Sequence, residues 1–197
     1  TSTHSSMPRP DNAIFALSRA LTRLADYDPP VQLIPITRRF LTALAKTSVA
    51  PLSDHLRTLA ESSDTAALAR ADREISKDPL LHAMIRNTIA PVMLNSGFRS
   101  NVIPGSAQAT VNLRLIPGTN PNDVIRDLER VVGDPAIEVK LANPATGPVG
   151  NPPSSEDTDL FRALVRQARA AFPGAEVAPY LFHAGTDAGA WRMRGVP

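Results

Sequence analysis

Arg114 is the side chain with the clearest chemical potential in this sequence, and it lies in the stretch from Asn101 to Pro117, which offers both a strand and a candidate anion site. A guanidinium group can bind an anion through two parallel hydrogen bonds. Apolar and polar residues alternate from Ala107 to Leu115, which is typical of a half-buried β-strand, so Arg114 points away from the core. The pattern alone leaves two interpretations open: an anion-binding arginine, or an ordinary polar residue on the solvated face of the strand.

A second candidate is the glycine-bearing turn from His183 to Gly189, which falls between a predicted strand at 177–182 and a helix-like segment at 190–194. In α/β proteins such a turn can present backbone amides to a ligand. The same residue types also form ordinary connections between a strand and a helix, and both interpretations stay open here.

Metal-ligating residues do not cluster in this sequence. The chain has no cysteine, and no two of its four histidines have the spacing of two ligands of one metal: His4, His55, His82 and His183. The nucleophile and zinc motifs Gly-x-Ser-x-Gly and His-Glu-x-x-His are also absent. We therefore expect no metal site built from this chain alone.

Helices and strands alternate in the segments that must position Asn101 and Arg114. A helix is predicted to begin near Asn12 with Asp11 as its N-cap, a strand over 87–94 with Pro91 at the sheet edge, and a strand from Ala107. A helix over 121–132 and a strand over 137–141 follow. If one strand precedes residue 1, this order predicts an α+β fold, a ferredoxin-like βαββαβ sandwich.

Two further segments complete the predicted organisation. Residues 31–87 read as three or four short helices and form a helical insertion in the sandwich. The Pro-, Gly- and Ser-rich segment 143–155 marks a boundary, after which a helix capped by Ser154 or Ser155 and the strand at 177–182 predict a partial α/β segment. The predicted domains are 1–145, with the insertion at about 31–87, and 146–197.

Charge and composition narrow the classes of partner. The 21 basic and 19 acidic residues give a formal charge of +2 without blocks of one sign, so charge predicts no nucleic-acid or membrane partner. No apolar run approaches the roughly 20 residues of a membrane-spanning helix. The absence of cysteine favours a reducing, cytoplasmic compartment and leaves export open.

Three motifs occur in a defined order along the chain. They are His-Ser-Ser-Met-Pro-Arg-Pro-Asp-Asn-Ala-Ile from His4, Asn-Val-Ile-Pro from Asn101 followed by Arg114, and Gly-Thr-Asp-Ala from Gly185 followed by Gly-Val-Pro. Together they resemble the di-zinc metallopeptidase family of aminoacylase, carboxypeptidase S, glutamate carboxypeptidase and succinyl-diaminopimelate desuccinylase. The helical insertion and the segment Ala-Gln-Ala-Thr-Val-Asn-Leu-Arg resemble the carboxypeptidase S branch most closely, and the resemblance covers nearly the whole chain.

The resemblance implies a dimerising lid domain followed by the first part of the returning catalytic domain. The whole enzyme would be a zinc-dependent hydrolase of amide bonds in peptides or N-acyl-amino acids. It would work as a homodimer and bind two zinc ions, whose ligands lie outside this sequence, so that this fragment alone is inactive. The resemblance assigns His4 to oxyanion stabilisation in the partner's active site and Asn101 with Arg114 to the substrate carboxylate. It places Gly185, Thr186 and Asp187 on a loop lining the same pocket.

Two residues depart from the family pattern. Thr3 stands where a glycine usually precedes the histidine, and His183 stands where a glycine is common before the Gly-Thr-Asp turn. Both concern loop geometry, and hence the exact substrate. The alternative interpretation is a non-catalytic ferredoxin-like module for dimerisation or small-molecule binding.

Overall fold

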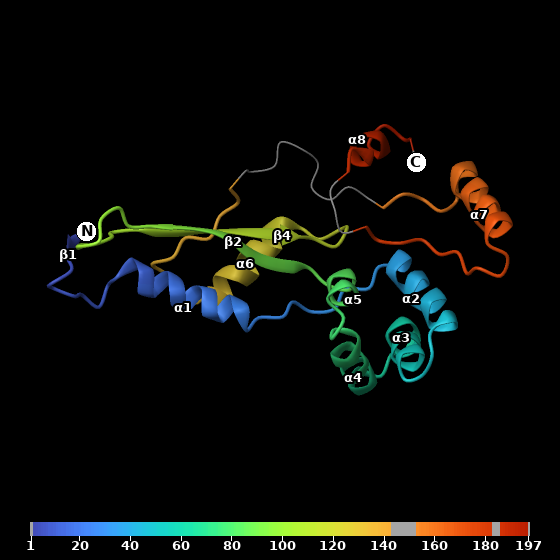
Figure 1. The fold of residues 1–197 in the computed structure, drawn as a ribbon, viewed down its shortest axis with the longest axis horizontal. Coiled ribbons are helices and arrows are strands. Elements are labelled where there is room, and N and C mark those ends of the chain that lie inside the picture. Colours follow the sequence, from blue (N-terminus) through green and yellow to red (C-terminus); the bar gives the residue numbers. More distant parts are fainter. Residues whose placement is uncertain (1, 143–152, 183–185, 197) are drawn as a thin grey trace. The chain divides into compact units, whose positions relative to one another are not determined.

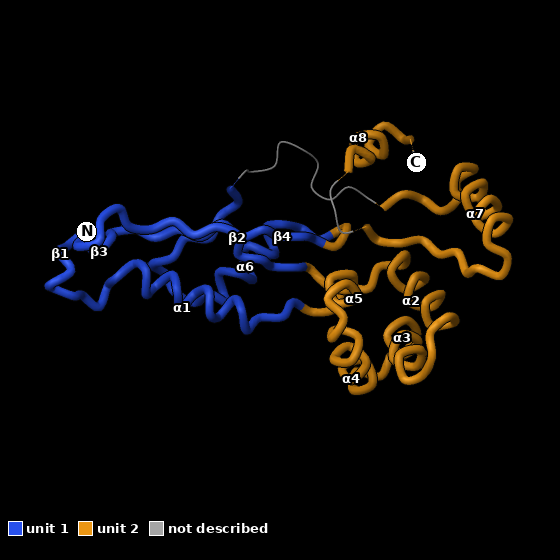
Figure 2. The backbone as a smooth tube through the Cα atoms, in the orientation of Figure 1, with its two compact units in different colours: residues 1–29, 88–115, 119–149 blue, residues 30–87, 116–118, 150–197 orange. Residues whose placement is uncertain are grey.

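The computed structural model describes residues 2–142, 153–182 and 186–196 of the chain. These residues fall into two compact units (Figure 2). Unit 1 comprises residues 1–29, 88–115 and 119–149, and unit 2 comprises residues 30–87, 116–118 and 150–197. The helical segment predicted as an insertion therefore lies in unit 2, whereas the segments before and after it lie in unit 1.

A long β-hairpin forms the frame of unit 1 (Figure 1). Its strands are β2 (Thr88–Ser96) and β4 (Ala107–Arg114), which pair antiparallel with Thr88 opposite Arg114 and Ser96 opposite Ala107. The register shifts between Pro91 and Met93, as expected where a proline removes a ladder donor. Among the described residues no strand pairs with the other edge of β2, so the predicted edge position is confirmed.

A second, short antiparallel pair lies at the tip of this hairpin (Figure 1). It consists of β1 (Thr3–His4) and β3 (Val102–Ile103), with His4 opposite Val102. Because β3 lies in the segment that joins β2 to β4, the pair ties the start of the chain to the hairpin connection.

Two helices accompany the hairpin in unit 1. Helix α1 (Ala13–Ala25) contacts both long strands and α6 (Pro121–Val132). The β4 residues in odd-numbered positions are half-buried and the even-numbered ones are exposed, which confirms the alternation read from the sequence. Arg23 of α1 also donates a hydrogen bond to the carbonyl of Val132 at the end of α6.

The predicted start of α1 needs one correction. The N-cap is Asn12, whose side chain accepts a hydrogen bond from the backbone N–H of Ile14 at 2.9 Å. Asp11, the predicted cap, instead accepts two hydrogen bonds of 2.7 Å from the guanidinium of Arg9. These bonds hold the pKa of Asp11 below its usual value. Arg9 therefore binds the Asp11 carboxylate, which could otherwise cap the helix.

Helix α6 agrees with its prediction at both ends. The side chain of Asn120 accepts from the backbone N–H of Asn122 at 3.0 Å, and Gly133 ends the helix in the left-handed conformation with φ of 56°. The buried residues of α6 are Val124, Leu128 and Val132, which lie three to four positions apart on one face.

The strand predicted over 137–141 is wrong, because these residues have no regular secondary structure. In a ferredoxin-like sandwich the last strand pairs with the first, and the first was expected to precede residue 1. Without that neighbour, residues 137–141 have no ladder to join. The α+β class is confirmed by the mixture of helices and two-stranded sheets, while the complete ferredoxin-like order stays a prediction.

Four helices form the core of unit 2, which agrees with the three or four short helices predicted for residues 31–87. They are α2 (Pro35–Thr47), α3 (Leu52–Glu61), α4 (Thr65–Ile75) and α5 (Pro79–Met84). Their largest fully buried apolar side chains are Leu41, Leu56, Leu59, Ile75, Met84 and, just after α5, Ile85. The segment that carries these four helices begins and ends at one place, because the backbone N–H of Gln32, before α2, donates to the carbonyl of Ile85, after α5, at 2.7 Å.

Two buried polar residues follow α5. Arg86 forms an ion pair with Asp72 of α4, so its buried guanidinium has a compensating charge. The side-chain oxygen of Asn87 accepts a hydrogen bond of 2.8 Å from the backbone N–H of Ile116. Residues 116–118 connect β4 to α6 and belong to unit 2, and the Asn87 bond attaches them to the rest of that unit.

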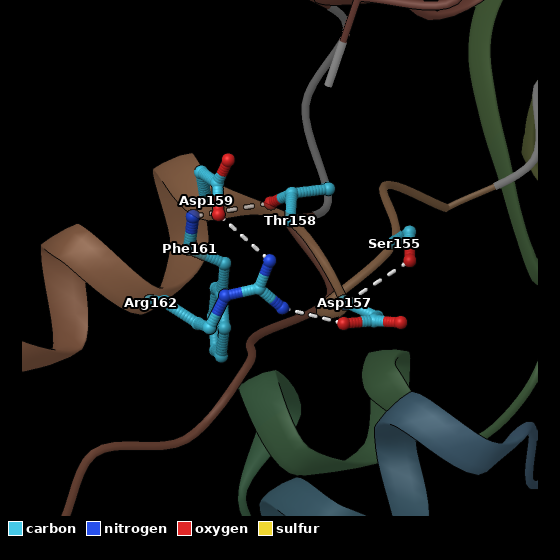
Figure 3. Close-up of polar contacts among 6 residues, drawn as sticks. All are labelled: Ser155, Asp157, Thr158, Asp159, Phe161 and Arg162. Atoms are coloured by element: carbon cyan, nitrogen blue, oxygen red, sulfur yellow. Dashed lines mark hydrogen bonds and ion pairs between the residues drawn. The ribbon is translucent and has the colours of Figure 1, made fainter.

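The last segments of unit 2 include α7 (Asp159–Ala171) and α8 (Ala188–Arg192). The N-cap of α7 is Thr158 rather than the predicted Ser154 or Ser155, and its hydroxyl accepts from the backbone N–H of Phe161 at 3.1 Å (Figure 3). Ser155 instead accepts from the backbone N–H of Asp157. The prediction placed the cap too early because several hydroxyl residues precede the helix.

Arg162 reinforces the start of α7. It donates hydrogen bonds to Asp159 and Asp157, which raise the pKa of its guanidinium (Figure 3). Unlike the helices of the core, α7 has no buried residue, and its apolar Leu160 and Leu164 are exposed.

The strand predicted at 177–182 is also wrong, because this segment is irregular. Tyr180 nevertheless contacts the ring of Phe40 edge-on at a centroid distance of 5.4 Å. A short apolar run needs a neighbouring strand to become a strand itself, and none pairs with it within the described part of unit 2.

Candidate functional site

His4 and Asn101 lie next to each other at the tip of the hairpin. His4 pairs with Val102, the neighbour of Asn101, and the backbone N–H of Ser5 donates to the carbonyl of Asn101 at 2.9 Å. The backbone N–H of Met7 donates to the carbonyl of His4 at 3.0 Å and closes a tight turn. Two backbone hydrogen bonds therefore fix the segment that carries the imidazole.

The imidazole of His4 is held on one side by Ser6. Its Nδ1 atom accepts a hydrogen bond of 3.2 Å from the backbone N–H of Ser6 and lies 2.7 Å from the Ser6 hydroxyl. Because a backbone N–H can only donate, this contact favours a lone pair on Nδ1, and the ring proton of the neutral imidazole then lies on Nε2. Nε2 has no partner among the described residues, and the side chain is exposed, so an N–H donor is available at the surface.

Sequence reasoning missed Ser6. The only signal was its position two residues after His4 in a turn, which is where Asn and Asp side chains commonly accept the backbone N–H of residue i+2. A histidine nitrogen makes the same kind of contact here.

Arg114 lies at the opposite end of the hairpin from His4 and Asn101. It is the last residue of β4 and pairs with Thr88, the first residue of β2. Its side chain is exposed, as predicted, and makes no hydrogen bond or ion pair with any described residue. Seven steps of β4 separate Arg114 from Ala107 at the tip, or about 23 Å at ~3.3 Å per residue. The structure therefore joins His4 with Asn101 and separates both from Arg114 within one chain.

Thr186 and Asp187 belong to unit 2, while Gly185 and His183 lie outside the described residues. The hydroxyl of Thr186 accepts a hydrogen bond of 3.3 Å from the backbone N–H of Ala188, and the carbonyl of Asp187 accepts from Ala190 at 3.0 Å. Thr186 and Asp187 lead into α8, whereas the strand predicted at 177–182 is not formed.

Possible metal ligands are dispersed over the described part of the chain. Within residues 2–142, 153–182 and 186–196, no three His, Asp or Glu side chains come together as a metal site requires. In the same residues, no helix has the length and apolar character needed to cross a membrane.

Comparison with known proteins gives consistent results along the chain. Residues 1–140 match the peptidase dimerisation domain of the M20 family. The chain is 32% identical over 184 residues to "Probable carboxypeptidase S-like 2" of Dictyostelium discoideum, covering 93% of this chain and 34% of that protein. It is 28% identical over 187 residues to "N-fatty-acyl-amino acid synthase/hydrolase PM20D1" of Mus musculus, covering 93% of this chain and 36% of that protein.

A solved structure shares the fold. An M20 family metallo-carboxypeptidase from Sulfolobus solfataricus superposes with a TM-score of 0.55 at 17% identity, over 96% of this chain and 50% of that chain. The 34% and 36% shares of the two curated relatives mean that this chain spans about a third of their length. Since the dimerisation-domain match covers well over half of the chain and the relatives agree with it, the chain belongs to the M20 metallopeptidase family, on its carboxypeptidase S branch.

Proposed function

We propose that this chain is part of a zinc-dependent hydrolase that cleaves the amide bond of peptides or N-acyl-amino acids. Residues 1–145, with the insertion at 31–87, would be its lid and dimerisation domain, and residues 146–197 the beginning of its returning catalytic domain. The family and the relatives' names support a hydrolase. The observation that carries the site assignment is the placement, at the two ends of one hairpin, of polar groups that have no side-chain partner among the described residues.

The chemistry of the two ends is complementary to the two ends of such a substrate. Hydrolysis of an amide develops negative charge on the carbonyl oxygen, and positioned N–H donors stabilise it. The Nε2–H of His4 is such a donor, and the amide of Asn101, whose backbone is bonded to the turn that carries His4, could add another. The guanidinium of Arg114 can bind the substrate carboxylate through two parallel hydrogen bonds.

One chain cannot present both ends to one small substrate. The amide carbonyl and carboxylate of an N-acyl-amino acid are less than about 7 Å apart, far short of the length of β4. We infer that the two groups in one active site come from different subunits of a homodimer. His4 and Asn101 of one subunit would then meet the substrate bound by Arg114 of its partner.

The free edge of β2 is suited to build this dimer. It carries three consecutive exposed apolar residues, Val92, Met93 and Leu94, which are 56%, 67% and 68% exposed. An unpaired, apolar strand edge readily pairs with another strand. If two β2 edges pair antiparallel about a twofold axis, the tip of each hairpin lies beside the Arg114 end of the other. This pairing would bring the separated groups together.

We also propose that unit 1 belongs to a ferredoxin-like fold and that the enzyme depends on zinc. The edge of β4 away from β2 can accept the first strand of the sandwich, to which residues 137–141 could then pair. The two zinc ions would be held by residues outside this sequence. Metal analysis of the full-length protein, with loss of activity after chelation and recovery with zinc, tests this part.

The dimer is tested by placing a charge on the β2 edge. Leu94→Lys in the full-length protein should shift the particle mass from dimer to monomer in light scattering, because the interface would bury an unpaired ammonium group. Leu80→Lys is the matched control, since Leu80 is exposed on α5 outside the hairpin. A Leu94→Lys protein that stays as dimeric as the control would exclude the β2 edge.

The carboxylate contact is tested by Arg114→Ala in the full-length enzyme, assayed with N-dodecanoyl-phenylalanine and with a dipeptide. We expect kcat/KM to fall by about 100-fold, in the range for losing a charge-assisted bidentate contact. Arg126→Ala is the control, because Arg126 is an exposed arginine of the same unit whose partner among the described residues is Asp123. Equal activity of both variants would refute the assignment, and a dimer without any hydrolysis would favour the non-catalytic module.

A further inference from the structure

We propose that Ser6 is a positioning residue for His4, which fixes the neutral imidazole in the tautomer that presents Nε2–H outward. The proposal rests on the function proposed above for His4. It adds a residue that has no contact of its own with the reacting atoms and acts only through the imidazole.

The geometry around Nδ1 favours one position of the ring proton. The backbone N–H of Ser6 points at Nδ1 at 3.2 Å and cannot serve as an acceptor. A proton on Nδ1 would therefore face a second proton. The Ser6 hydroxyl lies 2.7 Å from the same nitrogen, and as a rotatable O–H it supplies a second donor. The backbone N–H of Ser6 thus selects the lone pair on Nδ1, and the Ser6 hydroxyl strengthens this arrangement by donating to the same lone pair, which leaves the proton on Nε2.

The surrounding backbone keeps Ser6 in place. The Met7-to-His4 bond of 3.0 Å closes the turn in which Ser6 lies, and the Ser5-to-Asn101 bond of 2.9 Å anchors this turn to β3. The imidazole therefore cannot turn over without losing its contacts to Ser6. In the other tautomer, Nε2 would direct a lone pair at the developing oxyanion and would repel it instead of stabilising it.

The kinetic test uses the full-length enzyme with N-dodecanoyl-phenylalanine as the probe. We expect Ser6→Ala to lower kcat about fivefold, as for the loss of one neutral hydrogen bond, with little change in KM. Ser6→Thr keeps the hydroxyl and should restore most of the activity. Ser5→Ala is the matched control, because the exposed Ser5 hydroxyl makes no hydrogen bond with a described residue and its loss should leave kcat unchanged.

A double-mutant cycle separates positioning from a general structural role. If Ser6 acts through His4, Ser6→Ala should have no further effect in the His4→Ala background. An equal loss in both backgrounds, or no loss in the wild-type background, would overturn the proposal. If His4→Ala retains full activity, the oxyanion function of His4 fails, which is a separate result.

The tautomer itself can be observed by nitrogen NMR of the protein labelled with ¹⁵N-histidine, with the His4 signals assigned from His4→Ala. The wild type should show Nδ1 without a proton and Nε2 with one. Ser6→Ala should show a smaller Nε2–H population, and Ser6→Thr should recover it. An unchanged spectrum in Ser6→Ala would overturn the positioning role whatever the activity of the variants.

Discussion

Mixing two inactive variants tests whether each active site draws its residues from both subunits. Full-length His4→Ala lacks the donor at the hairpin tip, and full-length Arg114→Ala lacks the cation at the other end of β4. Each variant alone should lose most of its activity. When the two are unfolded, mixed in equal amounts and refolded, the proposed exchange between subunits predicts that activity returns.

The expected recovery follows from the placement of the two residues. At random assortment about half of the dimers contain one subunit of each kind. In such a dimer one site combines the intact Arg114 of the first subunit with the intact His4 of the second, and the other site has lost both. Half of the dimers therefore have one intact site out of two, which gives about a quarter of wild-type activity.

A matched mixture gives the control. Asn101 lies beside His4 at the same tip, through the Ser5 bond and the pairing of β1 with β3. A mixture of His4→Ala with Asn101→Ala should therefore recover nothing, because every site in the mixed dimer receives one damaged tip. The readout is the initial rate of N-dodecanoyl-phenylalanine hydrolysis, with the mixed species verified by native mass spectrometry.

Two results would refute the reasoning. Mixed dimers of His4→Ala and Arg114→Ala without activity would show that both residues serve a site within one subunit. Recovery in the His4→Ala and Asn101→Ala mixture would show that these neighbours act at different sites, against their placement at one hairpin tip.

Three substitutions in the full-length protein test the local structure through the free energy of unfolding in denaturant. Asn87→Ala should destabilise by about 1–3 kcal/mol, because it leaves the buried N–H of Ile116 without its acceptor; a smaller loss would show that the bond contributes little. Gly133→Ala should cost about 1 kcal/mol, because φ of 56° is unfavourable for a residue with a Cβ atom, and an unchanged stability would contradict the left-handed cap. Thr158→Ala should cost about 1 kcal/mol by removing the N-cap of α7, whereas Ser154→Ala, at the predicted cap position, should change stability by less than about 0.5 kcal/mol.

The sequence predicted the elements whose stability is decided locally. The helix from Asn120 to Gly133 has a cap at each end and one apolar stripe, and it was placed correctly. The strand from Ala107 was recognised from its alternation. The strands at 137–141 and 177–182 were not formed, because a strand exists only through hydrogen bonds to a neighbour, and the pattern of one segment says nothing about whether that neighbour is present.

The same distinction applies to the candidate site. The sequence indicated His4, Asn101 and Arg114 by residue type and motif, and their roles stay a proposal. Their distribution along the hairpin could not be read from a spacing of thirteen residues, because it depends on where β2 and β4 pair and where β1 joins them. The contact of Ser6 with Nδ1 depends on the conformation of one turn, for which two adjacent serines gave no distinguishing signal.

The hydrogen bond from Gln32 to Ile85 has a consequence for how such a chain can fold and diverge. It closes the helical insertion on itself, so that more than fifty residues enter and leave at one point. Its helices contact near neighbours in sequence and can form early, whereas the bond between Arg23 and Val132 joins residues 109 positions apart. Once the insertion is folded, α1 and β2 are joined as if by a short loop, which lowers the entropic cost of bringing them together. A segment attached in this way can be gained, lost or replaced in evolution while the hairpin keeps its register.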